Sequence, residues 1–150
     1  MRKPPAIETR PGTLTVLSVS PTEEDERCLQ AIISHSNWML FQAHDLVTAV
    51  SLLRQHRIAV VLCERDLASG TWIDLLEHIN DLPNVPSLIV TSRLADDRLW
   101  SEALNLGAWD VLAKPFDRRE VVRSVKLAWS HWYHKTVASG TSAGVMAAAS

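Results

Sequence analysis

The sequence predicts an α/β fold: a doubly wound, five-stranded parallel sheet covered by helices on both faces. Short apolar runs alternate five times with amphipathic stretches between residues 13 and 133, which is typical of βα units joined by right-handed crossovers. The run at 58–63, Ile-Ala-Val-Val-Leu-Cys, is apolar throughout and indicates a strand buried on both faces. Five units fit a three-layer, flavodoxin-like sheet of order 2-1-3-4-5 and are too few for an eight-stranded barrel.

Each unit is expected from its own local pattern. The strands are expected at 14–19, 38–43, 58–63, 87–91 and 109–113, and the helices that follow them begin near residues 21, 46, 71, 95 and 117. Ser20 is expected to be the N-cap of the first helix, with Pro21 at its first position, and Asp45 is expected to cap the second. Gly107 is expected to end the fourth helix. Trp129 shares an apolar stripe of the last helix, so it is expected in the core.

Composition limits the class of protein. The 150 residues carry 15 basic and 17 acidic side chains, a net charge of −2, and 47% are hydrophobic. A nucleic-acid-binding domain is usually clearly basic, and no apolar run is long enough to span a membrane, so neither nucleic acid nor membrane is an expected partner. No secretory signal follows the start, and two cysteines form no metal motif or disulfide framework. These features favour the cytoplasm.

The two ends of the chain differ in composition from the middle. Residues 1–12 contain three prolines and end on Gly12, and they predict a flexible leader. Residues 134–150 are mostly small and, after Lys135, uncharged, and they predict a flexible tail. The folded domain is therefore expected to span 13–133.

Polar side chains follow several of the expected strands. In an open parallel sheet, ligands bind beyond the carboxyl ends of the strands. Ser20 and Pro21 follow the first strand, Glu64 the third, Thr91 ends the fourth, and Lys114 follows the fifth. A carboxylate, a hydroxyl and an ammonium group are therefore expected to meet at one edge of the sheet.

Over about residues 13–133 the chain resembles the receiver domain of two-component response regulators. The resemblance rests on three segments: the run 107–116, Gly-Ala-Trp-Asp-Val-Leu-Ala-Lys-Pro-Phe, with its lysine-proline step; the run 89–92, Ile-Val-Thr-Ser, with its hydroxyl; and the run 61–70, in the place of the family's phosphorylation loop. It implies the receiver fold and a role in phosphorelay signalling.

The departures from the family's pattern lie at the active site, where only Thr91 and Lys114 match it. Ser20 and Pro21 stand where the family has an acidic pair that helps to hold Mg²⁺, and Glu64 stands at the phosphoacceptor aspartate. Ala68 replaces a proline, and Val111 replaces the aromatic switch residue. The acidic run 23–25 is expected to interact with the positive end of its helix rather than to bind an ion.

Magnesium needs about six oxygen ligands, and phosphoryl transfer depends on such a cation. We therefore expect no Mg²⁺, no other cofactor and no metal-dependent phosphorylation.

Two interpretations of Glu64 stay open. It either mimics a phosphorylated acceptor by pairing with Lys114, or forms a structural ion pair with Lys114 or Arg65. Asp66 is an alternative acceptor, although it lies two residues past the strand and is expected to point elsewhere. Val111 is too small to follow Thr91 between two positions, so the family's usual readout of phosphorylation is not expected.

The resemblance also implies a contact surface. The family uses the face of helix 4, strand 5 and helix 5 for dimers or partners, and four residues are candidates for it here: Trp100, Arg118, Arg119 and Arg123. Aromatic and arginine side chains are enriched at protein contacts. The sequence thus predicts a pseudo-receiver without enzymatic activity that acts by protein–protein contact. The alternatives are a receiver phosphorylated on Asp66 and a small flavodoxin-like enzyme or cofactor binder, although no glycine-rich loop follows the first strand.

Overall fold

The computed structural model describes the backbone of residues 13–149 and the side chains of residues 13–137. Five strands form one parallel sheet in the order β2-β1-β3-β6-β7: β1 (Thr15–Val19), β2 (Met39–Ala43), β3 (Val60–Glu64), β6 (Ser87–Ser92) and β7 (Asp110–Ala113). This order confirms the predicted doubly wound fold. The predicted leader, residues 1–12, lies outside the described residues.

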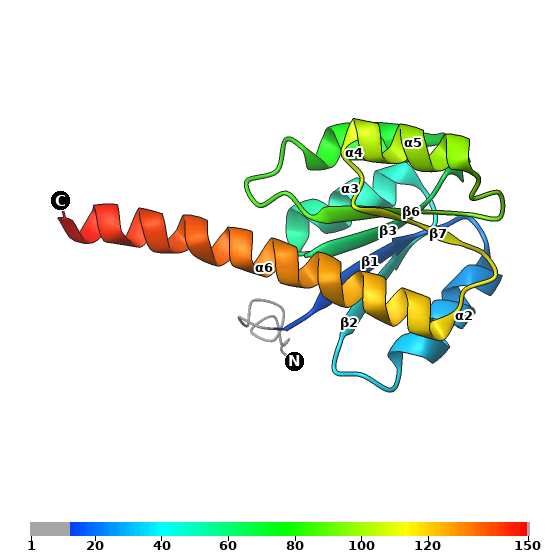
Figure 1. Ribbon diagram of the computed structural model, residues 1–150, viewed down its shortest axis with the longest axis horizontal. Coiled ribbons are helices and arrows are strands. Elements are labelled where there is room, and N and C mark those ends of the chain that lie inside the picture. The colour runs from blue at the N-terminus through cyan, green and yellow to red at the C-terminus, as the bar shows by residue number, and fades with distance from the viewer. Residues whose placement is uncertain (1–12, 150) are drawn as a thin grey trace.

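Helices cover both faces of the sheet (Figure 1). One face carries α2 (Glu23–Ile33) and α6 (Arg118–Ala149), and the other carries α3 (Leu46–Gln55), α4 (Trp72–Ile79) and α5 (Asp97–Leu106). In β3, Val60 and Leu62 join the core under α2 and α6, whereas Val61 and Cys63 join the core on the opposite face. Both rows of side chains are buried, which is why this strand is apolar throughout.

Two of the three predicted helix caps are confirmed and one is wrong. Asp45 accepts a hydrogen bond from the Thr48 N–H at 2.8 Å, and Gly107 ends α5 with φ 111°. The prediction that Ser20 caps the first helix is wrong: Thr22 is the N-cap, without a side-chain capping bond among the described residues. Ser20 instead donates its hydroxyl to the carboxylate of Asp25 at 2.7 Å.

A small antiparallel hairpin follows β3, where the sequence predicts a loop. It pairs β4 (Asp66–Leu67) with β5 (Gly70–Thr71) and leads into α4. A capping box begins that helix, because the Thr71 side chain accepts from the Ile73 N–H while Asp74 accepts from the Thr71 N–H. Glu64 is consequently the last residue of a strand rather than the first residue after it.

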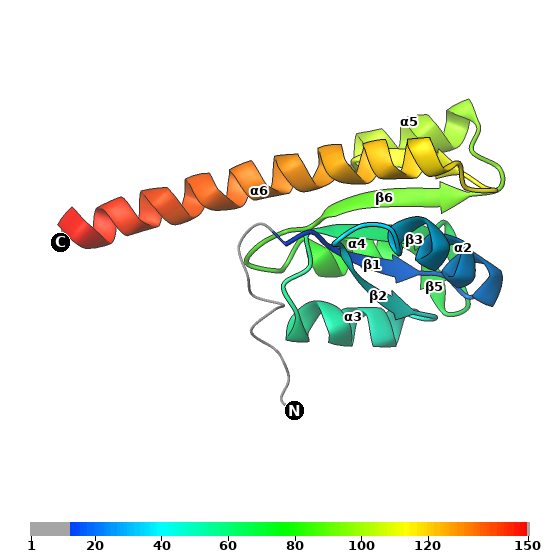
Figure 2. The same cartoon turned by 90° about the horizontal axis from the view of Figure 1, so that it is seen from below.

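The last helix is longer than the sequence predicted. It runs unbroken to Ala149 and extends past the end of the sheet (Figure 2), so the backbone of residues 134–149, where a flexible tail was expected, is helical. The stretch holds no proline and is rich in alanine, the best helix former. Of the two tryptophans of this helix, Trp132 rather than Trp129 is buried: Trp132 is 6% exposed, whereas Trp129 is partly buried and packs against the edge of this core. Within the described part of the chain, no helix has the length and apolarity to cross a bilayer.

Candidate functional site

The candidate site lies where β1, β3 and β7 end, at the carboxyl edge of the sheet. Here Lys114, just past the end of β7, forms ion pairs with Glu64 from β3 and with Asp25 from the first turn of α2. All three side chains are removed from water: Lys114 is 5% exposed, Asp25 7% and Glu64 16%. Of the carboxylate, the hydroxyl and the ammonium group expected at this edge, the carboxylate and the ammonium group are in contact, and a second carboxylate joins them.

Asp25 is the site residue that sequence reasoning missed. It was expected to interact with the N-terminal end of its helix, but its side chain turns inward and contacts Lys114. The two other acidic residues of that run do stay on the surface, since Glu23 pairs with Arg27 and Glu24 with Arg93. A signal was present: Asp25, Leu29 and Ile33 recur every four residues and share the buried face of α2.

Hydrogen bonds and charge keep Asp25 ionised. Burial raises the pKa of its carboxyl, but hydrogen bonds from Lys114, Ser20 and Thr22, together with the Lys114 charge, outweigh this effect and hold the pKa below its usual value. Glu64 forms an ion pair with Lys114 through its Oε1 atom, but the geometry of this contact is not that of a hydrogen bond. The result is one ammonium group enclosed by two carboxylates.

The mouth of the site is a shallow cleft of about 260 Å³. Nine residues line it: Pro21, Thr22, Glu64, Arg65, Asp66, Ser92, Arg93, Leu94 and Lys114. Pro21 offers no donor and no charge where the resemblance places an acidic residue. No group of three His, Cys, Asp or Glu side chains that could hold a metal ion is found among the described residues.

Asp66 lies at the rim of this cleft. Its side chain is 64% exposed and pairs with Arg65 at 3.0 Å. The neighbouring Arg65 is anchored through its backbone, because its N–H donates to the carbonyl of Thr91. Asp66 thus stands outside the buried cluster but next to its opening.

Thr91 and Val111, which the resemblance places at the family's two switch positions, are both buried. Thr91 pairs in register with Glu64 across β3 and β6, and Val111 pairs with Val90 across β6 and β7. Thr91 is 3% exposed and Val111 4%. Val111 packs into the core on the face that carries α3, α4 and α5.

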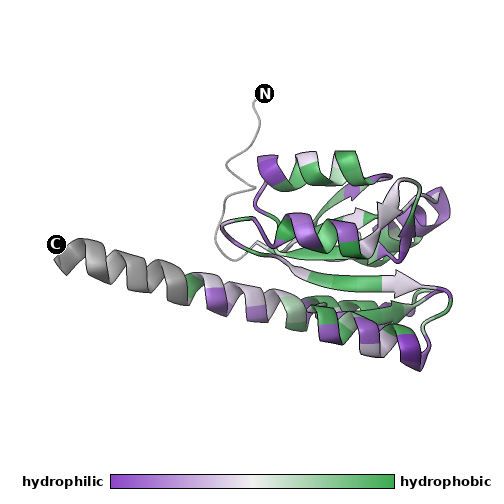
Figure 3. Cartoon of the chain, turned by 90° about the horizontal axis from the view of Figure 1, so that it is seen from above, coloured by the Kyte–Doolittle hydropathy of each residue, from purple (hydrophilic) through white to green (hydrophobic). Residues whose placement is uncertain are grey.

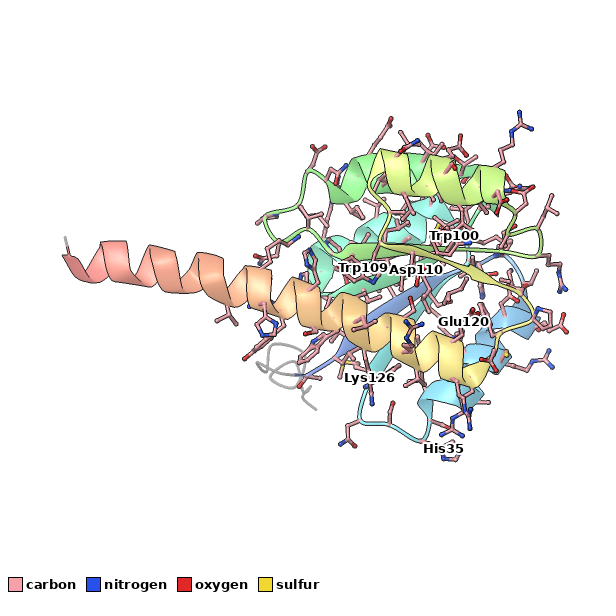
Figure 4. All side chains as sticks on the ribbon, viewed as in Figure 1. His35, Trp100, Trp109, Asp110, Glu120 and Lys126 are labelled. Carbon is pink, nitrogen blue, oxygen red and sulfur yellow. The ribbon has the colours of Figure 1, made fainter. Side chains whose placement is uncertain are left out.

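The candidate contact face consists of α5, β7 and the first part of α6. Figure 4 marks Trp100, Asp110 and Glu120, one residue from each of these elements. Trp100 and Leu104 project from α5 and Leu127 from α6, with 38%, 46% and 50% of their surfaces exposed. Three arginines of α6 are also exposed: Arg118, Arg119 and Arg123. Ser124 holds α6 to β7 through a 2.5 Å hydrogen bond to Asp110.

Neither cysteine lines the cleft at Lys114, and the environment of Cys63 does not favour a nucleophile. Burial, with the charge of Glu64 as a second cause, raises the pKa of the Cys63 thiol. Cys28 is partly buried on α2, and both thiols are free. A thiol that stays protonated is a poor nucleophile.

Comparison with known proteins points to one family. The model of the response regulator receiver domain family matches residues 16–126. The transcriptional regulatory protein CpxR of Escherichia coli K12 is 30% identical over 120 residues, which cover 78% of this chain and 50% of CpxR. The chain spans half or less of the length of the curated relatives it matches.

Solved structures share the fold. The signal receiver domain of an HD domain-containing protein from Pseudomonas fluorescens Pf-5 superposes with a TM-score of 0.77 at 24% identity, covering 85% of this chain and 95% of that domain. The beryllofluoride-activated NtrC4 receiver domain, solved as a dimer, gives 0.73 at 20% identity, covering 79% of this chain and 98% of that one.

Proposed function

The chain belongs to the response regulator receiver domain family, and we propose that it is a cytoplasmic receiver that signals by protein contact without taking up a phosphoryl group. One observation carries this proposal: the Lys114 ammonium lies between the carboxylates of Asp25 and Glu64. The family match over residues 16–126 favours this function over a flavodoxin-like enzyme or cofactor binder.

The residues at the site do not fit the magnesium ion that the family implies. Both carboxylates already contact Lys114, which compensates one of their two charges, and the end of β1 contributes the Ser20 hydroxyl and Pro21. Magnesium takes about six oxygen ligands in strict octahedral geometry. A divalent cation would have to displace Lys114, whose own charge would then repel it. Lys114 takes the place of the cation, and we infer no step through a metal.

The acceptor position supports the same proposal. Glu64 is the residue at the acceptor position, and its Oε1 is committed to Lys114. This geometry favours the interpretation of Glu64 as part of a permanent ion pair. With this ion pair the site has one charge state, in place of the unphosphorylated and phosphorylated states of a switching receiver.

The aromatic side chain that would report phosphorylation by changing its position is also missing, because Val111 stands in its place. Val111 fills a place in the core at 4% exposure, and its short side chain has one favoured rotamer. Moving it would open a cavity without delivering an aromatic ring to the surface. The signal must therefore come from surfaces that exist in the single folded state.

The face of α5, β7 and α6 is the surface proposed for that contact. Trp100, Leu104 and Leu127 supply apolar area there, and Arg118, Arg119 and Arg123 supply charge at its edge. Tryptophan and arginine are the residue types that most often dominate binding energy. The NtrC4 receiver domain is a dimer, and a second copy or a partner protein is the proposed occupant here.

Phosphorylation is tested by incubating the chain with acetyl phosphate and Mg²⁺ and measuring its intact mass. We expect no phosphoryl adduct on the natural chain, and none on Glu64→Asp, because Lys114 still blocks the ion. A receiver domain that keeps the family's acidic pair and acceptor aspartate serves as the positive control. An adduct on the natural chain that disappears in Asp66→Asn would establish the alternative, an acceptor at the rim of the cleft.

The contact surface is tested by light scattering and sedimentation of Trp100→Ala and Arg123→Glu. A loss of self-association, or of binding to a purified partner, is expected in both. Lys126→Glu, which changes an exposed charge on the same helix, is the matched control. Unchanged association in all three variants would contradict this assignment.

A further inference from the structure

We propose that the groove between α3 and α4 binds an amphipathic helix of a partner protein that carries a carboxylate toward one end. The groove shares no lining residue with the cleft at Lys114, and its helices are separate from the proposed α5–β7–α6 face. The proposal extends signalling by contact to a second surface. It rests on the proposed function in one respect only, namely that the chain signals by binding other proteins.

The groove lies between α3 and α4, which pack against the same part of the core. Ala49 and Leu53 of α3 and Leu75 and Ile79 of α4 are buried side by side under the two helices. The groove above them has a volume of about 490 Å³. A narrower hollow of about 140 Å³ continues it between Val50, Arg54, His78 and Leu82.

One half of the groove is apolar. Leu46 and Val50 lie one turn apart on α3 and are only partly covered by the core, and Val47 beside them is 76% exposed. Single exposed apolar residues are ordinary, but these three line one hollow together. Apolar side chains gathered in a hollow with a polar rim are a feature of protein contact sites.

The other half is polar and basic. Arg54 continues the row of Leu46 and Val50 at the next turn and faces His78 across the groove. Arg54 makes no ion pair with any described residue, and His78 uses Nδ1 on the carbonyl of Asp74. Asp81 is the one carboxylate among the described lining residues. Figure 3 shows this change along α3, from hydrophobic residues to hydrophilic ones at its C-terminal end.

The order of these groups defines the partner. Leu46 and Arg54 are two turns apart, a rise of about 12 Å. A docked helix would place apolar side chains at i and i+4 over Leu46, Val47 and Val50, and a carboxylate about one turn further on, where the Arg54 guanidinium can bind it through two parallel hydrogen bonds. A second copy inserting its own α5 would join unlike surfaces, which close into a ring only at particular rotations and otherwise grow as an open filament, so we assign the groove to a partner.

The test uses a stapled helical peptide of about three turns with two leucines four residues apart and a glutamate four residues later. Its twin carries lysine in place of the glutamate. Titrating each into the isotope-labelled chain by NMR is expected to shift the amides of Val47, Val50 and Arg54. The glutamate peptide is expected to bind about tenfold tighter than its twin.

Variants of the chain make the test decisive. Arg54→Glu is expected to reverse the preference, so that the lysine peptide binds more tightly, whereas Arg98→Glu on α5 leaves it unchanged. Val47→Glu places an acidic residue in the first turn of α3, where the helix favours one, and is expected to abolish binding while the chain stays folded.

Three results would overturn the proposal: equal affinity for both peptides, shifts confined to α5 and α6, or the same shifts appearing on concentration without peptide, which would identify a second copy. Each of these outcomes is independent of the phosphorylation assay.

Discussion

Replacing Lys114 by methionine is expected to destabilise the chain most at neutral pH and to reverse its response to mild acid. Methionine keeps the length of the side chain but removes the charge, so Asp25 and Glu64 would face each other without a cation. In the natural chain the pKa of Asp25 lies below its usual value. The stability that this ion pair supplies is therefore present above about pH 4 and is lost as the pH falls through the lowered value.

The size of the effect follows from burial. Removing one partner from a buried ion pair costs about 3–5 kcal/mol, and here two carboxylates with exposed fractions of 7% and 16% lose their partner. For a domain of this size, that cost lowers the melting temperature by roughly 10–20 °C. Repulsion raises the pKa of one carboxyl in the variant. Its stability is consequently highest below about pH 4 and falls as the pH rises through the raised value.

The assay is urea denaturation of both chains between about pH 2 and pH 8, a range that includes the acid side of both stability profiles. Lys126→Met, an exposed lysine on α6, is the control and is expected to change little. Adding Glu64→Gln to Lys114→Met should restore part of the loss at neutral pH, because one of the facing charges is gone. A loss below about 1 kcal/mol, or a pH profile parallel to that of the natural chain, would refute the argument that Lys114 acts as the cation of this site.

Three further variants or measurements test the surroundings of the site. Asp25→Asn should lower the free energy of unfolding by about 1–3 kcal/mol at pH 7. It should also make that free energy depend less on pH in the acid range, because Lys114 keeps its contact with Glu64 but the carboxyl that titrates there is gone. An unchanged pH dependence in the acid range would contradict this. Gly70→Ala should cost about 1 kcal/mol in thermal melts, since the added Cβ would lie 2.6 Å from the Asp74 carboxylate that caps Thr71; equal stability would show that the cap adjusts freely. Cys63 should react with a thiol reagent far more slowly than Cys28 in the folded chain, because burial raises the pKa of its thiol, and the two rates should converge in urea.

The strands and their order followed from the sequence because their causes are local. Alternation of apolar runs with amphipathic stretches predicts βα units, and right-handed crossovers leave few ways to arrange five of them. Lys114 and Glu64 were placed at one edge of the sheet for the same reason, since parallel strands present their carboxyl ends together. The start of α2 was not predicted correctly, because the Ser20 hydroxyl donates a hydrogen bond to the Asp25 carboxylate instead of capping the backbone of the helix.

Two features did not follow from the sequence. The first is the length of α6, which continues through an alanine-rich stretch whose composition suits a helix and a linker equally. The second is the pairing of Asp25 with Lys114, 89 residues apart in the chain. An acidic residue in the first turn of a helix is stabilised by the helix itself, so the sequence offered a sufficient local explanation. Only the docking of α2 over the end of β1 turned that side chain away from solvent and toward a buried cation.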